Sequence, residues 1–329
     1  MSASCIRGFR WHFAGTVARL RIVDSSPNGP LPLNPVSACE TVSSMRTAVD
    51  PRQRVLSGLP VSERRVPLAG SSTSLLEGGD GPTLILLHGG IECGGAYWSP
   101  VIPSLARSFH LVVPDVPGVG ESAPPPRMDA AAFAEWFRAL LSETICPEKP
   151  ILLAHSMVGS LAARFAAGDA DQLRSLVLYG VPGIGPFRMP FGLMAAAIRF
   201  SLRHDETSFE RFLPWPFLEP ERTRGRDPEW FQAFSAYMES RASVPHVRRT
   251  MRQLIAAGKR RVRDDELRRI QIPTALLWGE QDRMTPVSRA EGTSKRLGWP
   301  LHVVHDAGHV PHIERPAAFV EALKAALEV

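Results

Sequence analysis

The chain has 329 residues, of which 44% are hydrophobic and 22% charged; this excludes a disordered chain and allows one large core with an insertion. The net charge is +5, but the basic residues are scattered or lie beside acids, as in 259–266, which disfavours a nucleic-acid partner. No apolar run approaches the ~18 residues of a membrane span, and four cysteines without CxxC spacing predict a reducing, cytoplasmic compartment.

The first 60 residues differ from the rest of the chain. Residues 1–23 are basic and contain no acid, and residues 24–60 are rich in Pro, Ser, Gly and Asn. This composition predicts a disordered, non-catalytic extension over 1–60. Two origins stay open for residues 1–44, a targeting segment or an over-extended start upstream of Met45.

From residue 61 onward, short apolar runs alternate with amphipathic stretches. This alternation predicts a parallel sheet covered by helices on both faces. The expected strands are Thr83–Leu87, Leu111–Val113, Ile151–Ala154, Leu176–Leu178, Thr274–Trp278 and Leu301–Val304. The expected helices include one from Trp98 to Leu105, one capped by Asp129, one ending at Gly168, one near Ser288–Leu297 and one over 316–328.

The alternation stops between residues 184 and 265. Helical pieces are expected at Phe191–Leu202, Glu229–Ser240 and Val247–Ala257, and no convincing strand is present. The pattern predicts a helical cap over 184–265, inserted between two parts of one core, 61–183 and 266–329. Its large apolar side chains are expected mostly to pack the cap itself and in part to favour a hydrophobic substrate: Phe187, Phe191, Met194, Phe200, Phe212, Trp215, Phe217, Trp230 and Phe231.

A serine directly follows the expected strand Ile151–Ala154, in His155-Ser156-Met157-Val158-Gly159. A sharp strand-to-helix turn would expose the Ser156 hydroxyl beside the N–H groups of a helix N-terminus, which makes it a candidate nucleophile. The alternative is that Ser156 simply caps the helix. The motif departs from G-x-S-x-G, because Ala154 and Val158 take the glycine positions, and the β-branched Val158 is expected to crowd the turn.

The segment His88-Gly89-Gly90-Ile91 follows the first buried strand. Glycine lets a backbone approach a substrate closely, so the Gly90 N–H is the expected oxyanion donor, with Ile91 as the alternative and Met157 as the second donor. In the other interpretation the segment is a turn and His88 is a structural histidine bonded to backbone groups.

An acid and a histidine follow the last two expected strands. Asp282 is the candidate that orients the base, and Glu280 is its competitor. His309 is the candidate general base. Because the carboxyl ends of parallel strands meet at one edge of a sheet, we expect these groups to lie near Ser156.

Two other histidines, His305 and His312, lie close to His309 in the sequence. A zinc site of the helical type is disfavoured, because Gly308 and Pro311 interrupt the segment. We therefore expect His305 and His312 to have local structural roles.

The order of these motifs, oxyanion loop, Ser, acid and His, resembles the α/β-hydrolase superfamily. The resemblance covers residues 61–329 except the cap and includes the loop Asp115-Val116-Pro117-Gly118-Val119-Gly120-Glu121-Ser122. It implies an α/β-hydrolase fold, with a mostly parallel eight-stranded sheet and a lidded pocket. Related dehalogenases and epoxide hydrolases have an Asp nucleophile where this chain has Ser156, which disfavours both.

The resemblance implies a serine hydrolase that cleaves an ester-type bond (carboxylic ester, lactone or thioester) through an acyl-enzyme, with neither cofactor nor metal. The expected partner is a small to medium hydrophobic molecule, and the oligomeric state stays open. Two alternatives remain: a carbon–carbon bond hydrolase of the meta-cleavage product type, and a catalytically weak ligand-binding homologue, which Val158 keeps open.

Overall fold

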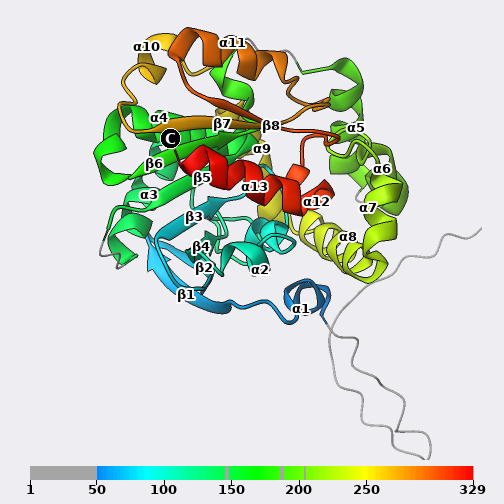
Figure 1. Cartoon of the computed structure of the whole chain (residues 1–329). Coiled ribbons are helices and arrows are strands. Elements are labelled where there is room, and N and C mark those ends of the chain that lie inside the picture. Colours follow the sequence, from blue (N-terminus) through cyan, green and yellow to red (C-terminus); the bar gives the residue numbers. More distant parts are fainter. Residues whose placement is uncertain (1–49, 145–147, 186–188, 204, 329) are drawn as a thin grey trace, which may run out of the picture. The chain divides into compact units, whose positions relative to one another are not determined.

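In the described part of the chain the strands form a single sheet, which is seen in the centre of Figure 1. The computed structural model describes residues 50–144, 148–185, 189–203 and 205–328. The strands are β1 (Ser62–Leu68), β2 (Ser71–Gly78), β3 (Thr83–Leu87), β4 (His110–Pro114), β5 (Ile151–His155), β6 (Ser175–Tyr179), β7 (Thr274–Gly279) and β8 (Leu301–Val304).

The strand order within these described residues is β1-β2-β4-β3-β5-β6-β7-β8. Strands β3 to β8 are parallel to one another, whereas β2 pairs antiparallel with β1 and with β4. The prediction of an eight-stranded, mostly parallel sheet is confirmed.

Alternate residues of the central strands belong to two separate apolar cores. In β3, Leu84 and Leu86 pack in one core, and Ile85 and Leu87 pack in the other. Successive side chains of a strand point to opposite faces, so a sheet that is covered on both faces needs continuous apolar runs. This explains why the central strands were visible in the sequence.

Helices from different parts of the chain cover the two faces. The core that contains Leu84 includes residues of the 3₁₀ turn η1 (Gly94–Trp98), α2 (Ile102–Leu105) and α13 (Pro316–Leu327). The core that contains Ile85 includes residues of α3 (Ala130–Glu143), α4 (Ser156–Asp169) and α11 (Ser288–Leu297). The Asp129 side chain accepts bonds from the N–H groups of Ala131 and Ala132 and so caps α3, as expected.

Two helix predictions were wrong in detail. The single helix expected from Trp98 to Leu105 is divided into η1 and α2, with Pro100 between them, which lacks the N–H that a continuous helix needs. Helix α4 does not end at Gly168. It continues to Asp169, and Gly168 does not have the positive φ of a C-terminal cap.

The described part of the insertion between β6 and β7 contains helices and connecting loops but no strand (Figure 1). The helices are the 3₁₀ turn η3 (Pro182–Ile184), α5 (Phe191–Arg203), α6 (Glu206–Phe212), α7 (Pro220–Arg226), α8 (Pro228–Ala242), α9 (Pro245–Gly258) and α10 (Asp264–Leu267). The limits 184–265 for the cap stay a prediction. We refer to α5–α9 as the cap.

The prediction of a disordered extension up to residue 60 was wrong for its last residues. Residues 51–56 form helix α1, in which the Asp50 side chain accepts the Arg52 N–H at 3.0 Å. Val55 is buried in the same core as Leu84, and Arg52 pairs with Glu63 of β1. Because α1 contributes apolar area to the core, it is ordered despite its polar surroundings in the sequence. Residues 1–49 lie outside the described residues, as do the predictions for them.

None of the helices in the described ranges combines the length and the hydropathy that crossing a membrane requires.

Candidate active site

The chain turns sharply from β5 into α4 at Ser156. Ser156 has φ of +52°, a left-handed conformation that non-glycine residues rarely adopt. The strain is held because β5 pairs on both sides and α4 packs beneath the sheet. The turn places the Ser156 hydroxyl at the carboxyl edge of the sheet, beside the first N–H groups of the helix, as in a nucleophile elbow.

The close packing that this turn requires occurs at Gly159 instead of at residue 158. A Cβ on Gly159 would lie 2.4 Å from Val181 Cγ2 and 2.8 Å from the Ala154 carbonyl oxygen. Val158 is fully buried in the apolar core beneath the turn. Val158 thus packs in this core, and its effect on the elbow stays a prediction.

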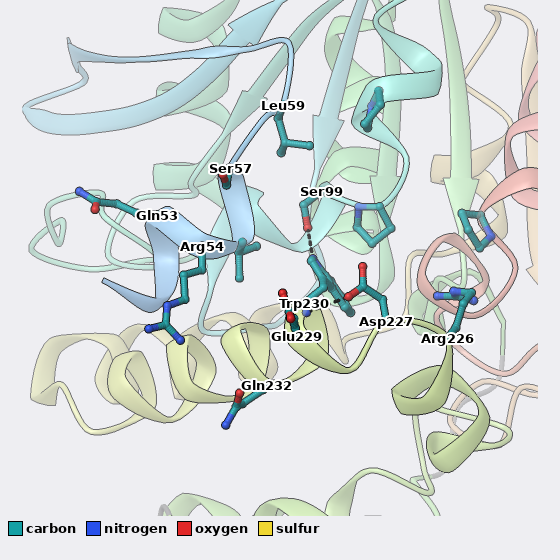
Figure 2. Close-up of a pocket in the computed structure, with 14 residues that line it drawn as sticks. Gln53, Arg54, Ser57, Leu59, Ser99, Arg226, Asp227, Glu229, Trp230 and Gln232 are labelled. Carbon is teal, nitrogen blue, oxygen red and sulfur yellow. Dashed lines mark hydrogen bonds between the residues drawn. The ribbon is translucent and has the colours of Figure 1, made fainter. Parts of the chain in front are cut away.

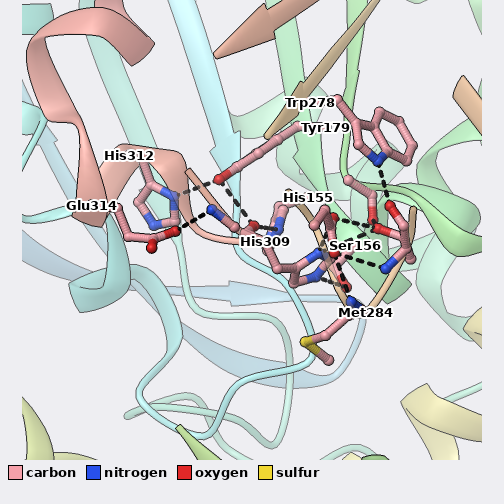
Figure 3. A network of polar contacts seen from close by, with 12 residues as sticks. His155, Ser156, Tyr179, Trp278, Met284, His309, His312 and Glu314 are labelled. Atoms are coloured by element: carbon pink, nitrogen blue, oxygen red, sulfur yellow. Dashed lines mark hydrogen bonds and ion pairs between the residues drawn. The ribbon is translucent and has the colours of Figure 1, made fainter. Parts of the chain in front are cut away.

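Three polar side chains from three separate loops meet at this edge. His309 Nε2 lies 3.0 Å from Ser156 Oγ, and His309 Nδ1 lies 2.7 Å from Asp282 Oδ2. All three residues are buried, and Ser156 is the most exposed at 7%. The distances allow His309 to accept the hydroxyl proton while Asp282 holds the other ring nitrogen. Figure 3 shows Ser156 and His309 within their polar network.

Asp282 is held by the turn that follows it. Its Oδ1 accepts the Met284 N–H at 2.8 Å and the Thr285 N–H at 2.7 Å, and its Oδ2 accepts the Thr285 hydroxyl at 2.6 Å. Trp278 Nε1 in turn donates to the Thr285 carbonyl at 2.6 Å. The competitor Glu280 is partly exposed and contacts His305 at 3.2 Å. Asp282 therefore contacts the candidate general base His309, whereas Glu280 contacts His305.

Thr285 was not among the residues predicted for the site. An acid that is followed three residues later by Thr is typical of a turn in which the acid side chain accepts backbone N–H groups. That signal was present in the sequence, but its link to His309 depends on the fold.

The loop that carries His309 is fixed from both sides. Its N–H donates to the Pro216 carbonyl in the cap at 2.8 Å. Its carbonyl accepts from the Tyr179 hydroxyl and from His155 Nε2, both at 3.2 Å. The His309 ring is thus positioned by backbone contacts as well as by Asp282. Figure 3 shows His155 and Tyr179 beside His309.

The other histidines near the site are structural in their contacts. Burial lowers the pKa of His155 and of His312 well below the ordinary value, so both are neutral. His312 Nδ1 bonds the Tyr179 hydroxyl at 2.9 Å, and His305 is 79% exposed at its side chain. Among the described residues, no three His, Cys, Asp or Glu side chains form a group that could hold a metal.

The two expected oxyanion donors, Gly90 and Met157, lie side by side. Gly90 lies against Met157, since a Cβ on Gly90 would be 3.6 Å from Met157 Cγ. The Ile91 N–H is engaged, because it donates to the Gly89 carbonyl at 2.9 Å. This removes Ile91 as the alternative donor and leaves Gly90 and Met157 as the candidate pair. Gly89 must be a glycine, because its Cβ would lie 2.6 Å from His155 Nδ1.

His88 stabilises the loop that follows β3. Its Nδ1 bonds the Gly89 carbonyl at 2.7 Å, and its Nε2 accepts the Val116 N–H at 3.0 Å. Burial lowers the pKa of His88 to about 4, so it stays neutral. The structural interpretation of His88 therefore fits its contacts.

The loop from Asp115 to Ser122 has a supporting role. The Asp115 carboxylate accepts the Gly95 N–H at 2.5 Å and the Glu121 N–H at 2.7 Å. Burial raises the pKa of Asp115 to about 6, although these two bonds oppose the rise. Asp115 thus joins the loop after β4 to the turn η1, which lies under the oxyanion loop.

A cavity of about 130 Å³ opens at Ser156 and His309 beneath the cap. Its walls are mostly apolar and aromatic and come from the oxyanion loop, α5, α6, α8 and α9: Ile91, Ala197, Phe200, Phe209, Phe212, Leu213, Phe217, Phe234, Met238, Met251 and Ile255. Such a wall binds an apolar group by excluding water.

A larger hollow of about 890 Å³ lies elsewhere, between α1 and α8 (Figure 2). It is lined by polar and charged residues such as Arg54, Asp227 and Glu229, and Trp230 closes one side by donating to Ser99 Oγ at 3.0 Å. None of Ser156, Asp282 and His309 lines it. The smaller cavity is therefore the candidate substrate pocket.

The large apolar residues of the cap do not all have the same environment. Phe200, Phe212 and Phe217 line the catalytic cavity, and Phe231 is buried within the cap. Phe191 and Met194 are exposed on α5, at 79% and 41%, and so were wrongly expected to pack the cap. Phe187 lies outside the described residues. Trp215 packs against Gly192, whose Cβ would lie 2.7 Å from it.

Comparison with known proteins agrees with this geometry. The family model for the alpha/beta hydrolase fold matches residues 82–316, so the chain belongs to the α/β-hydrolase family. The matched span includes Ser156, Asp282 and His309, which follow one another in the order that is typical of this family.

Among its relatives is the pimeloyl-[acyl-carrier protein] methyl ester esterase of Aeromonas hydrophila. It is 26% identical over 268 residues, which cover 77% of this chain and 98% of that protein. Among solved structures, a bacterial membrane phospholipase A is 27% identical, with a TM-score of 0.69 and coverage of 84% of this chain and 88% of that one. A 2-hydroxy-6-oxo-6-phenylhexa-2,4-dienoate hydrolase from Rhodococcus is 24% identical, with a TM-score of 0.71 and coverage of 82% and 100%; it shares the fold.

Proposed function

We propose that the protein hydrolyses carboxylic esters with a short to medium apolar acyl group, through an acyl-enzyme on Ser156. The observation that carries the proposal is the continuous contact Ser156–His309–Asp282 at the mouth of an apolar cavity. Relatives that are named esterases support the same reaction class.

In the proposed mechanism, His309 Nε2 takes the proton of Ser156 as Oγ attacks the ester carbonyl carbon. The N–H groups of Gly90 and Met157 stabilise the resulting oxyanion, and each such donor contributes about 3 kcal/mol to the transition state. Asp282 stabilises the imidazolium. His309 then gives its proton to the departing alkoxide and later activates the water that releases the acid.

The size of the cavity limits the substrate. A dry engineered cavity of about 150 Å³ holds a benzene-sized molecule, and the catalytic cavity is about 130 Å³. We therefore expect acyl groups of a few carbons to be favoured over long chains. The aromatic walls favour an apolar chain, which fits the small to medium hydrophobic substrate.

The carbon–carbon hydrolase remains the second candidate, because the Rhodococcus dienoate hydrolase shares the fold. A dienoate is a carboxylate, and its binding would normally use a cationic side chain. No Lys or Arg is among the described residues that line the cavity. The cavity therefore favours neutral esters over dienoates.

The test is intact-mass spectrometry after incubation with a fluorophosphonate probe, which reacts with activated serines. We expect one adduct on the wild type and none on Ser156→Ala. Esters of increasing acyl length and a ring-cleavage dienoate are then compared by turnover. The absence of an adduct on folded wild-type protein would contradict an activated Ser156 and favour the ligand-binding alternative.

We further propose a cytoplasmic protein without a nucleic-acid partner. Cys93 is buried and unpaired, which supports a reducing compartment. The basic run at 259–263 is neutralised in part by its own neighbours, since Arg261 pairs with Asp264 at 3.2 Å and Arg263 with Asp265 at 3.0 Å. These pairs support a solvated surface and not a phosphate-binding one.

A further inference from the structure

Glu92 lies in the wall of the catalytic cavity, two residues after Gly90. Its backbone carbonyl accepts the Gly120 N–H at 3.0 Å, which fixes this part of the oxyanion loop. The residue is partly buried, and the same cavity wall includes apolar and aromatic residues such as Tyr97, Phe234 and Met238. An acid in an apolar wall beside the reacting serine needs an explanation, because burying a carboxylate is costly.

Other buried carboxylates of this protein have clear structural partners. Asp115 accepts two backbone N–H groups from different segments. Glu314 likewise accepts the Leu218 N–H at 2.6 Å and the Gly308 N–H at 2.7 Å, and so joins the cap to the histidine loop. These carboxylates connect parts of the fold.

The Glu92 carboxylate, in contrast, has no hydrogen bond to another segment among the described residues. Its carboxylate has a backbone hydrogen bond within its own residue, and no Lys or Arg is among the described residues of the cavity wall. Burial raises the pKa of Glu92 to about 7, the direction expected for a carboxyl group without a compensating cation. Glu92 thus lies in the cavity wall without a cationic side chain beside it in that wall, among the described residues.

Apart from its histidines, Glu92 is the one ionisable side chain in the cavity wall, among the described residues, that changes charge near neutral pH. The remaining polar groups are Ser156, Ser201 and the Tyr97 hydroxyl, and the hydroxyls are neutral. In a cavity of low polarity, charges interact more strongly than in water. A single carboxylate can therefore determine the charge of the substrate that the cavity accepts.

We propose that Glu92 forms a specificity subsite that binds a cationic or hydrogen-bond-donating group at the end of the ester substrate and rejects substrates with a carboxylate there. The inference rests on the proposed esterase function and specifies its substrate class. A cation in this subsite supplies the partner that Glu92 lacks in the protein. A carboxylate would face a like charge in a low-dielectric cavity, and discrimination by such repulsion is strong.

The test uses the full-length protein and three methyl esters that differ at the far end of the acyl chain. They are methyl pentanoate, methyl 4-(dimethylamino)butanoate and monomethyl glutarate, which at about pH 8 are neutral, cationic and anionic. Release of acid is followed in a pH-stat, and kcat and KM are determined separately for each ester. At about pH 8 Glu92 is mostly ionised, since its pKa is about 7.

For the wild type we expect kcat/KM for the cationic ester to exceed that for the anionic ester by roughly 10-fold or more, mainly through KM. Glu92→Gln keeps the size of the side chain, and we expect it to reduce this ratio by roughly 10-fold. The matched control is Glu291→Gln, which removes the same charge from the exposed surface of α11 and should leave the ratio unchanged.

Each outcome decides between the two proposals. Absence of turnover of all three esters would overturn the esterase function, and the subsite with it. Turnover with equal preference for the cationic and anionic esters in the wild type would overturn the subsite alone, and this comparison does not depend on the folding of a variant. The same would follow if Glu92→Gln left the ratio unchanged.

Discussion

The carboxyl edge of the sheet and the cap form the two sides of the candidate active site, and they are held by different forces. At the sheet edge, hydrogen bonds and backbone conformation fix the candidate reactive residues: Ser156 by a left-handed turn and Asp282 by two N–H groups of its own turn. His309 is fixed at its N–H and carbonyl by hydrogen bonds to groups of other segments. The short-range contacts of Ser156 and Asp282 leave few alternatives for the chain there.

The cap is held mainly by the packing of apolar and aromatic side chains. Phe200 stacks on Phe212, with ring centroids 5.9 Å apart, and Trp230 stacks on Phe234 at 4.9 Å. A few polar contacts join the cap to the histidine loop, such as Arg222 to Asp306 at 3.0 Å. Apolar packing tolerates substitution as long as volume is kept. We infer that the sheet edge determines the reaction and the cap determines the substrate, so variants on the two sides should change different kinetic constants.

The largest effect is expected at the acid of the sheet edge. Asp282→Asn keeps the shape of the side chain but lets the wrong tautomer of His309 face Ser156, so kcat should fall by roughly 10⁴-fold. Steady-state kinetics with a neutral ester measure this. Glu280→Gln, two residues away, is the matched control and should retain activity. A loss in the control equal to that in Asp282→Asn would contradict the assignment.

A smaller effect on kcat is expected at Thr285. Thr285→Val removes the hydroxyl that donates to Asp282 Oδ2 and keeps the volume. We expect kcat to fall roughly 10-fold while KM changes little, because the lost hydrogen bond is worth about 1–2 kcal/mol. Thr293→Val, at a buried threonine that bonds the Ile184 carbonyl, is the control for loss of a buried hydroxyl. Equal losses of kcat in both variants would indicate a general loss of packing.

The opposite kinetic pattern is expected in the cap. Phe212→Ala removes an aromatic wall of the cavity and should raise KM roughly 3- to 10-fold for a short apolar ester, with little change in kcat. Phe191→Ala, on the exposed face of α5, is the control and should change neither constant. A fall in kcat without a change in KM would break the proposed division between the sheet edge and the cap.

The requirement for a glycine at the strand-to-helix turn can be tested by comparing the free energies of unfolding of variants at two glycines of α4. Gly159→Ala should destabilise the protein by about 1–3 kcal/mol, because its Cβ would collide with Val181 and the Ala154 carbonyl. Gly168→Ala has no atom within 4 Å of the new Cβ and should stabilise α4 by about 0.5–1 kcal/mol. Denaturant unfolding measures both. Equal effects of the two substitutions would mean that Gly159 is not needed for the turn.

The smallest effect is a pH dependence of stability at Glu92. Its pKa is about 7 in the folded protein and 4.5 ordinarily, so the folded state binds the proton more tightly. The stability associated with protonation is present below about pH 4.5 and is lost as pH rises to about 7. Glu92→Gln should therefore raise the melting temperature by roughly 2–4 °C at about pH 8 and by much less at about pH 5. A difference in melting temperature between Glu92→Gln and the wild type that does not depend on pH would contradict the raised pKa of Glu92. Because other groups titrate in both proteins, their contribution cancels in this difference.

The sheet and the candidate reactive residues could be predicted from the sequence. Continuous apolar runs such as Ile151–Ala154 can only be buried on both faces, and the spacing of Ser156, Asp282 and His309 after such runs places all three at one edge. The parallel strands β3 to β8 were therefore predictable from such runs, whereas the total of eight strands was implied by the family resemblance. The strands β1 and β2 were implied by the family resemblance and not by their own pattern, because half of β1 is exposed.

The residues that support or surround the candidate reactive groups became visible in the tertiary structure alone. Thr285, Glu92 and the choice of Gly90 over Ile91 depend on which groups from distant segments meet, and on which N–H groups are already used. The cap shows the same limit, since the periodicity of α5 does not reveal that Phe200 faces the cavity while Phe191 faces solvent. Local patterns specify elements because hydrogen bonding and burial act along a segment, whereas contacts between segments depend on how the whole chain packs.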